Sequence, residues 1–260
     1  MCRHLAYLGA PVPLGALLVE PEHGLLRQSW APRRQRHGVV NADGFGVGWY
    51  ADGDPIPARY RSDRPMWTDG SLLDIARVVR SGAVLAAVRS ATVGLPYAVG
   101  AAAPFAAGRH LFSHNGVVPG WPASAAVLAA GLPVAELLGI LGREASTDSA
   151  VLWALVEQRL AAGASVAEAA ADVVVHAARS AGGRLNLLLT DGAQIVATTW
   201  GDTLSWRADE RGVVVASEPY DDTAGWVDVP DRSLLVARPD GVTVEPLDKP
   251  PDKSQDMEVR

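Results

Sequence analysis

The chain opens with Met1-Cys2-Arg3-His4-Leu5-Ala6-Tyr7-Leu8-Gly9, a stretch that predicts a buried strand directly after a reactive residue. Cys2 is the only cysteine among 260 residues, which excludes an intramolecular disulfide framework and a CxxC site. Loss of Met1 would leave Cys2 with both a thiol and a free α-amine. Such an amine has a pKa of about 7.7–8.0, so it can accept a proton near neutral pH. Cys2 is therefore a candidate nucleophile with its own base, and the alternative is an incidental cysteine at the start of a strand.

The first 20 residues loosely resemble a secretory signal, because Arg3 and His4 precede an apolar stretch from Leu5 to Val19. Glycines and prolines interrupt this stretch, and no small-x-small cleavage site follows it. No segment reaches the roughly 18 uninterrupted apolar residues of a membrane span. We therefore expect a strand at His4–Leu8 and a cytoplasmic protein without a membrane partner.

Length and composition fit one globular α/β or α+β domain with a substantial core. The formal net charge of −6 gives no electrostatic reason to expect a nucleic-acid partner. The short run Arg33, Arg34 and Arg36 is more typical of a solvated loop than of a phosphate site. From residue 248 onward the chain is polar and lacks apolar periodicity. We expect one domain over residues 2–247 and a disordered tail over residues 248–260.

Apolar, β-branched runs predict the strands of this domain. Asp191-Gly192 lies between two of the runs and indicates a hairpin. The predicted strands are His4–Leu8, Gly46–Tyr50, Ala83–Ser90, His110–His114, Arg184–Thr190, Gln194–Thr199, Gly212–Ser217, Ser233–Arg238 and Val242–Glu245.

Helices are predicted in two blocks. The first is Ser71–Ser81, which opens with Ser71 and Asp74 at capping-box spacing. The second runs from Pro133 to about Ser180, with breaks at Gly142 and Ala162-Gly163 and a capping box formed by Ser165 and Glu168. Strands, then helices, then strands again favour an α+β fold with segregated helical layers. Two antiparallel sheets between two helical layers would suit this order.

Two segments near strand ends could lie beside Cys2. Asn41–Tyr50 has alternate glycines, which let a backbone pass close to its neighbour, and it predicts a strand packed tightly beside the N-terminal strand, entered through a turn at Asp43 and Gly44. Arg89 follows an apolar strand, where an arginine is costly unless paired. Its guanidinium group matches either a ligand carboxylate or a neighbouring Asp or Glu, and the sequence leaves both open.

Two more segments complete the candidate set. In Phe112-Ser113-His114-Asn115-Gly116, the Asn side-chain amide and the Gly backbone N–H could form an oxyanion hole, although an ordinary Asn-Gly turn also fits. Ser146-Thr147-Asp148-Ser149 opens a helix, where Asp148 is either a cap or a ligand. The histidines lack metal-binding spacing, so we expect no metal site. The chain also lacks the G-x-S-x-G motif of serine hydrolases.

Taken together, the opening stretch, NADGFGVGWY, Arg89 in VRSATVG, SHNG and STDS resemble the class II glutamine amidotransferases, which are N-terminal-nucleophile hydrolases. The order and spacing match over about residues 2–220. Within that family the chain is most similar to the stand-alone amidohydrolases of ergothioneine biosynthesis, which remove the γ-glutamyl group from γ-glutamyl-hercynylcysteine sulfoxide. The resemblance implies a four-layer αββα sandwich.

The resemblance also implies roles for five residues. Cys2 matches the nucleophile, Asn115 and Gly116 match the oxyanion hole, Arg89 matches the residue that binds the glutamyl α-carboxylate, and Asp148 matches the residue that binds the α-ammonium group. The charges agree with this assignment, because a zwitterionic head group needs one set of donors and one carboxylate. One position departs from the pattern: many relatives have His where Val93 stands, which argues against a polar role there. Trp30, Trp49 and Trp121 could line the leaving-group pocket or belong to the core.

The expected reaction is amide hydrolysis through a Cys2 thioester, with a small-molecule γ-glutamyl substrate and no cofactor. Two alternatives remain open: a glutaminase that supplies ammonia to a separate synthase, and a non-catalytic binding relative that retains Met1. The residues do not identify the leaving group, the oligomeric state or any pathway partner.

Overall fold

The computed structural model describes residues 2–92 and 94–247, so the expected tail and Val93 lie outside the described residues. The polypeptide forms two antiparallel sheets. The first contains β1 (Arg3–Pro13), β2 (Phe45–Trp49), β3 (Ala58–Ser62), β4 (Arg80–Val88), β9 (Ser205–Asp209), β10 (Gly212–Ala216) and β11 (Val227–Asp228). The second contains β5 (Phe105–Ala107), β6 (His110–Val117), β7 (Arg184–Thr190), β8 (Ile195–Thr199), β12 (Ser233–Arg238) and β13 (Gly241–Pro246).

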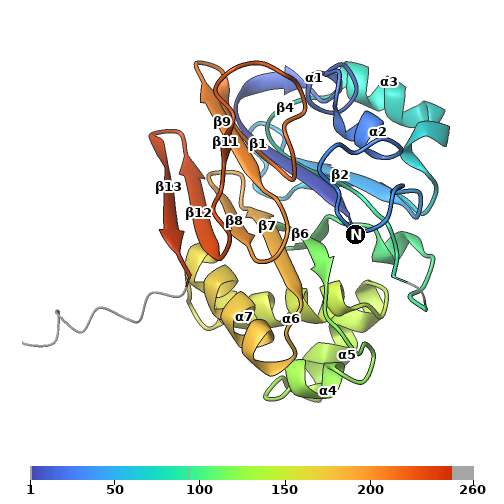
Figure 1. Cartoon of the computed structure of the whole chain (residues 1–260), viewed down its shortest axis with the longest axis vertical. Helices are drawn as coiled ribbons and strands as arrows, with labels where there is room; N and C mark the ends of the chain where they lie inside the picture. The colour runs from blue at the N-terminus through green and yellow to red at the C-terminus, as the bar shows by residue number, and fades with distance from the viewer. Residues whose placement is uncertain (1, 93, 248–260) are drawn as a thin grey trace, which may run out of the picture.

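Helices cover the outer face of each sheet (Figure 1). The first sheet has the order β11-β9-β10-β1-β4-β2-β3, and the second has the order β13-β12-β8-β7-β6-β5. The predicted α+β fold, a four-layer αββα sandwich, is confirmed. The helices beside the first sheet are α1 (Gly15–Leu18), α2 (Leu25–Gln28) and α3 (Gly70–Val78), and those beside the second are α4 (Ala125–Leu128), α5 (Val134–Arg143), α6 (Asp148–Ala161) and α7 (Val166–Ser180). Two 3-10 turns are η1 (Met66–Thr68) and η2 (Val99–Ala101).

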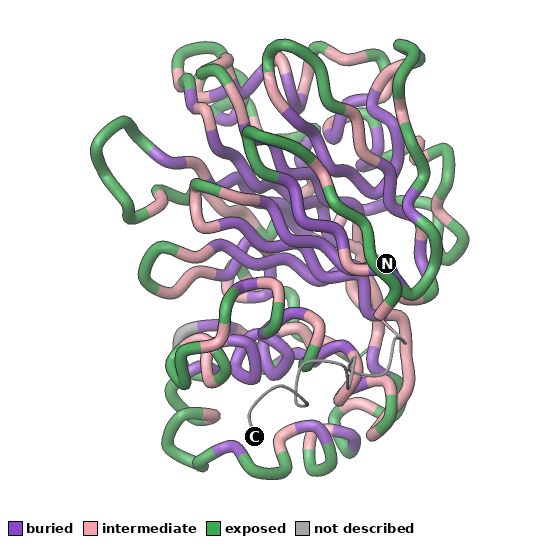
Figure 2. Tube along the Cα trace, turned by 90° about the vertical axis from the view of Figure 1, so that its left-hand side faces the viewer, coloured by how far each residue is buried: buried purple, intermediate pink, exposed green. Residues whose placement is uncertain are grey.

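The first part of β1, residues 3–8, is buried on both faces, which explains the continuous apolar run from Leu5 to Leu8. Leu5 and Tyr7 pack in the core beneath α1–α3, whereas Ala6 and Leu8 pack in the core between the two sheets. Because side chains alternate along a strand, His4 shares the inward face of Ala6. Figure 2 shows the same burial, with the sheet strands largely buried and the connecting loops exposed.

The glycine-rich strand β2 does not lie beside β1, so the prediction of that pairing is wrong. Strand β4 separates them and pairs with both. The glycines instead permit a close approach between the sheets: a Cβ on Gly48 would lie 2.7 Å from Leu111 of β6. The predicted entering turn is confirmed, since Gly44 has φ of +119°.

Helix α3 begins and ends earlier than its sequence predicts. Asp69 is the N-cap residue and its carboxylate accepts a hydrogen bond from Leu72 N at 3.0 Å, so the predicted Ser71–Asp74 capping box is wrong. The helix ends at Val78 because Arg80 and Ser81 already belong to β4, where they pair with the end of β1.

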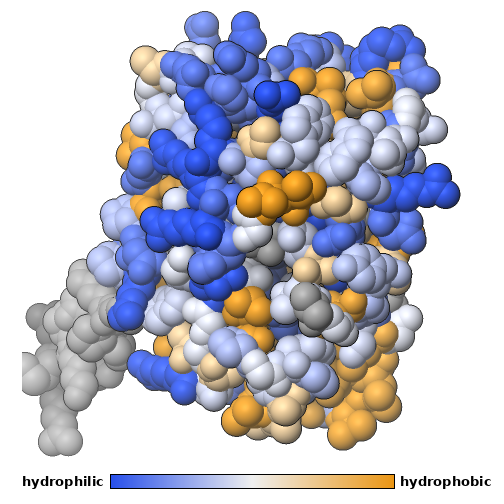
Figure 3. Space-filling model, turned by 45° about the vertical axis from the view of Figure 1, so that its right-hand side comes forward, coloured by the Kyte–Doolittle hydropathy of each residue, from blue (hydrophilic) through white to orange (hydrophobic). Residues whose placement is uncertain are grey.

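The second helical block follows its sequence signals more closely. It divides into α5, α6 and α7, and the predicted capping box of Ser165 and Glu168 is present at the start of α7. The Asp191-Gly192 hairpin joins β7 to β8, with φ of +84° at Gly192. Figure 3 shows apolar side chains gathered at the lower right of the molecule, and α5 carries the exposed Val134 and Leu138. Across residues 2–92 and 94–247, no helix has the length and apolar character needed to cross a membrane.

Candidate functional site

Cys2 lies half-buried directly before β1, near the N-terminus marked in Figure 1. Its backbone nitrogen donates a hydrogen bond to Oδ1 of Asn115 at 3.0 Å, which joins the first sheet to β6 of the second. In the full chain this nitrogen belongs to the Met1–Cys2 peptide bond. After loss of Met1 the same nitrogen would be the α-amine.

Asn115 and Gly116 lie within β6, so the alternative of an Asn-Gly turn is wrong. The Asn115 side chain is completely buried, and its Nδ2 has no hydrogen-bond partner among the described residues. This orphaned donor is notable, because buried polar atoms usually have a partner. Gly116 is required sterically, since a Cβ there would overlap the Arg184 carbonyl oxygen. The pair can therefore present an unused amide donor beside Cys2.

Arg89 directly follows β4 and is buried, with 6% of its surface exposed. Its Nη1 donates to the Asp43 carbonyl oxygen at 3.3 Å, while Nη2 is buried without a partner in the described chain. The Asp43 carboxylate instead accepts from Ala91 N at 2.7 Å. No carboxylate in the described ranges forms an ion pair with Arg89, so the salt-bridge alternative is wrong. A buried cation of this kind calls for an anionic ligand.

Asp148 is the first residue of α6, and only 4% of its surface is exposed. The N-cap is Thr147, whose hydroxyl accepts from Ala150 N at 3.1 Å, so the cap interpretation of Asp148 is wrong. The Asp148 carboxylate accepts from Val118 N at 2.9 Å and from Ser149 N at 2.8 Å. No Lys or Arg of the described chain forms an ion pair with this carboxylate.

One cleft brings together Cys2, Arg89, Gly116 and Asp148. Asn115 lies buried behind it, with its oxygen on the Cys2 nitrogen. The cleft therefore presents one cation, one carboxylate and one thiol from three distant parts of the sequence. This arrangement can bind a small group that carries both a carboxylate and an ammonium, with a third functional group next to sulfur.

Two histidines beside the cleft were not among the predicted site residues. His4 is fully buried, and its Nδ1 lies 3.1 Å from the Ser113 hydroxyl, which lines the cleft. Burial lowers the pKa of His4 to about 3, so the imidazole is neutral at physiological pH. His114 has its Nδ1 2.9 Å from the Ser149 hydroxyl. Strand alternation could have found His4, because it lies two residues after Cys2 and on the inward face of β1 with Ala6.

The arginine-rich run is held more tightly than a solvated loop. The carboxylate of buried Glu218 accepts hydrogen bonds from the backbone nitrogens of Arg33 and Arg34, both at 2.8 Å. Nε of Arg3 donates to Oε1 of Gln35 at 3.2 Å. Burial lowers the pKa of Arg3, and the nearby Glu218 carboxylate opposes that shift. The segment is thereby fixed against the start of β1, next to Cys2.

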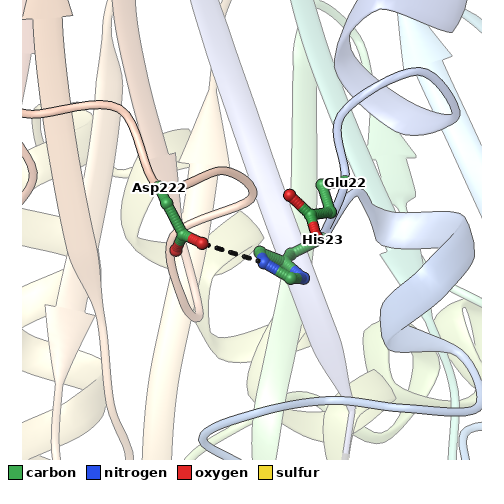
Figure 4. Close-up of side chains that lie close together, drawn as sticks. All are labelled: Glu22, His23 and Asp222. Carbon is green, nitrogen blue, oxygen red and sulfur yellow. Dashed lines mark hydrogen bonds and ion pairs between the residues drawn. The ribbon is translucent and has the colours of Figure 1, made fainter.

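A group of Glu22, His23 and Asp222 could in principle hold a metal ion (Figure 4). Asp222 already accepts from Nη1 of Arg33 at 2.7 Å and lies 3.3 Å from Nε2 of His23. An arginine on the carboxylate competes with a divalent cation, and Glu22 and Asp222 are exposed. The group is therefore better explained as an ion pair that joins two surface loops.

The three candidate tryptophans occupy different places. Trp121 lines a second hollow that shares Asp148 with the cleft. Trp49 packs in the core beneath α1–α3. Trp30 is partly exposed and lies 5.9 Å from Trp67, edge to face. Of the three, only Trp121 adjoins the site.

Three kinds of comparison place this arrangement among known proteins. A family model described as "Glutamine amidotransferases class-II" matches residues 24–207. A gamma-glutamyl-hercynylcysteine sulfoxide hydrolase of Mycolicibacterium smegmatis is 47% identical over 95% of this chain and 100% of its own length. The protein of the same name in Mycobacterium tuberculosis is 48% identical over 96% of this chain and 98% of its own length.

Solved structures agree on the fold. A glutamine aminotransferase class-II domain protein from Silicibacter pomeroyi matches with a TM-score of 0.65 and 26% identity, over 95% of this chain and 100% of that protein. Half of the glutamine phosphoribosylpyrophosphate amidotransferase of B. subtilis matches 96% of this chain with a TM-score of 0.66 and 14% identity, which shows the fold alone. With the family model covering most of its length and relatives matched end to end, the chain belongs to the class II glutamine amidotransferases.

Proposed function

We propose that the protein hydrolyses the γ-glutamyl amide bond of γ-glutamyl-hercynylcysteine sulfoxide and releases glutamate. The observation that carries the proposal is the cleft in which buried Arg89 and buried Asp148 lie with Cys2. The names of relatives at 47% and 48% identity support the choice of substrate.

The glutamyl head group would bind by charge. Its α-carboxylate would accept hydrogen bonds from the guanidinium of Arg89, whose Nη2 has no other partner in the described chain. Its α-ammonium would donate to the carboxylate of Asp148. Because both side chains are buried, each charge is worth more here than at a surface, and each is costly without its ligand. These two contacts would set the γ-carbonyl carbon against the Cys2 sulfur.

The first half-reaction forms a thioester. The α-amine of Cys2, free after loss of Met1, accepts the thiol proton as sulfur attacks the γ-carbonyl carbon. The carbonyl oxygen becomes an oxyanion, which Nδ2 of Asn115 and the backbone N–H of Gly116 stabilise. The ammonium of Cys2 then gives its proton to the leaving nitrogen, and the carbon–nitrogen bond breaks.

The second half-reaction consumes one water. The α-amine accepts a proton from that water, whose oxygen attacks the thioester carbon through the same oxyanion site. The carbon–sulfur bond breaks, the thiolate recovers a proton from the α-ammonium, and glutamate leaves. The products are glutamate and hercynylcysteine sulfoxide, and the enzyme returns to its starting state.

Three substrates test the proposal: γ-glutamyl-hercynylcysteine sulfoxide, γ-glutamyl methylamide and free glutamine. Glutamate release should be fastest from the sulfoxide conjugate and should vanish in Cys2→Ala, with intact-mass measurement showing loss of Met1 in the active protein. Faster turnover of glutamine would favour the glutaminase alternative. Normal turnover by Cys2→Ala would refute the thioester mechanism.

A further inference from the structure

We infer that a hollow on the far side of Cys2 from Arg89 is the subsite for the leaving amine, and that Arg36 and Asp231 recognise its charged groups. This inference rests on the proposed function. The hollow has a volume of about 270 Å³, just below the roughly 300–1,000 Å³ typical of small-molecule sites. Arg36, Asp202, Thr203, Asp228 and Asp231 are among its lining residues.

The order of strands gives the direction in which the substrate runs. In the first sheet β1 lies between β4, which leads to Arg89, and β10, which leads to Glu218. In the second sheet β6 lies between β5 and β7. The glutamyl cleft contains Arg89 and Phe105, so it lies on the β4 and β5 side. A substrate held there, with its scissile bond at Cys2, directs its amine portion toward β10 and β7.

The hollow lies on that second side, and contacts tie its lining to the catalytic strands. Asn186 of β7 is the direct partner of Asn115, and its Nδ2 donates to the carbonyl oxygens of Asp202 at 3.0 Å and Thr203 at 3.3 Å. The Thr203 hydroxyl donates to the carbonyl oxygen of Ser217 at 2.7 Å. The backbone nitrogen of Ser217 in turn donates to the carbonyl oxygen of His4.

A further link comes from the arginine-rich segment. Gln35 accepts a hydrogen bond from Arg3, next in sequence to Cys2, and Arg36 follows Gln35 directly. The hollow is therefore built from the turn after β8, the 33–36 segment and the loop before β12, and two of these contact residues beside Cys2.

The charges of the lining suit a zwitterionic amine. Asp202 is paired with Arg184 at 3.1 Å, and Asp228 is paired with Arg34 at 2.6 Å. Oδ1 of Asp231 accepts a hydrogen bond from Gly201 N at 2.7 Å. This exposed carboxylate forms no ion pair with a cation of the described chain. Hercynylcysteine sulfoxide carries carboxylates and a trimethylammonium group. A quaternary ammonium has no N–H, so it is recognised by negative charge and apolar contact.

We assign Arg36 to a carboxylate of the leaving amine and Asp231 to the trimethylammonium. Leu204 and Val229, which also line the hollow, offer apolar surface to its methyl groups. The glutamyl head is assigned to the cleft with Arg89 and Asp148, which shares no lining residue with this hollow. Losses at Arg36 and Asp231 should therefore appear only with substrates that carry the full amine.

The test measures kcat/KM of the processed enzyme on γ-glutamyl-hercynylcysteine sulfoxide and on γ-glutamyl methylamide, which shares the scissile bond but lacks the charged amine. Arg36→Ala and Asp231→Asn should each lower the value for the sulfoxide conjugate by roughly tenfold or more, as for loss of a charged contact. The value for the methylamide should change by less than about twofold. Asp231→Asn retains Oδ1 for the Gly201 nitrogen, which limits structural damage.

Arg238→Ala and Asp240→Asn serve as controls, because both make the same charge changes at exposed positions near the β12–β13 turn. Neither control variant should change kcat/KM for either substrate. If both subsite variants retain the wild-type preference for the sulfoxide conjugate, or lose activity equally on both substrates, the subsite assignment is wrong. If the wild-type protein shows no such preference, the proposed function fails instead, and this outcome is visible without any variant.

Discussion

Replacing Asn115 with alanine should lower kcat by about 100- to 1,000-fold and leave KM within about threefold. The Asn115 side chain is fully buried, and its Nδ2 has no partner in the described residues, so the amide is a donor held ready for a ligand. Removal of one oxyanion donor costs about 2.7–4 kcal/mol of transition-state stabilisation. The interaction forms as charge develops on the carbonyl oxygen, which is why binding of the ground state should change little.

The same replacement also affects the fold. Oδ1 of Asn115 accepts from the Cys2 nitrogen at 3.0 Å, and loss of this acceptor should cost about 1–3 kcal/mol. A domain with a typical stability of about 5–15 kcal/mol would remain folded. Asn115→Asp separates the two effects: it keeps an acceptor for Cys2 but lacks the amide donor.

The assay is initial-rate glutamate release over a range of substrate concentrations, combined with thermal unfolding of each variant. Asn115→Ala and Asn115→Asp should lose kcat to a similar degree, whereas only the alanine variant should lose the hydrogen bond to Cys2. If folded Asn115→Ala retained more than about a tenth of the wild-type kcat, the proposed oxyanion role would be refuted.

Three further predictions concern pH, stability and steric fit. Burial lowers the pKa of His4 to about 3, so the unfolded chain binds a proton on acidification before the folded protein does. Below about pH 6 the wild type should lose about 1.4 kcal/mol of stability per pH unit relative to His4→Gln, measured by urea unfolding, and parallel curves would contradict this. Glu144 is buried and lies 2.6 Å from Arg61, so Glu144→Ala should cost about 3–5 kcal/mol by thermal unfolding. The exposed-pair control Asp74→Asn should cost less than about 1 kcal/mol, and equal costs would count against the argument. Gly116→Ala should abolish glutamate release, because its methyl group would overlap the backbone of β7, and normal kinetics in that variant would exclude the observed geometry.

The sequence predicted the layers of this fold because the inner strands of both sheets and the long helices carry strong apolar patterns. It missed the short strands β5 and β11. It also missed β3 and β9, which lie towards the edges of the first sheet and contain mostly polar or charged residues. Such strands are stabilised by backbone pairing on a sheet already formed, and charged residues are typical of edges. Their sequences therefore carry little periodic signal.

The glycine-rich strand shows a different limit. Alternate glycines correctly predicted a close approach, but the nature of the neighbour depends on strand order, which no local pattern specifies. The actual neighbour is the opposite sheet, where Leu111 lies against Gly48. The local sequence determined that another chain segment can approach β2 closely, whereas the tertiary topology determined which segment does so.

The candidate site shows the same division. Each of Arg89, Asn115 and Asp148 had an ordinary structural explanation. The structure shows no ion pair for Arg89 in the described chain, no turn at Asn115, and Thr147 rather than Asp148 as the N-cap residue of α6. The combined failure of these three alternatives is what supports a shared site. A salt bridge, a turn and a cap are independent alternatives, so nothing in the fold alone requires all of them to be absent. The proposed binding of one zwitterionic group beside Cys2 would account for all three together.

Asn115 also bears on how the site comes into being. Its oxygen is already bonded to the Cys2 nitrogen in the full-length chain, and its amide donor is already free of other partners. An α-amine can make the same donation to that oxygen. On the proposed mechanism, removal of Met1 would create the base without requiring β1 or β6 to move, because the acceptor that orients the nitrogen would be the same before and after processing. One buried side chain would orient the base through its oxygen and stabilise the oxyanion through its nitrogen, and this explains why a completely buried asparagine lies at the meeting point of the two sheets.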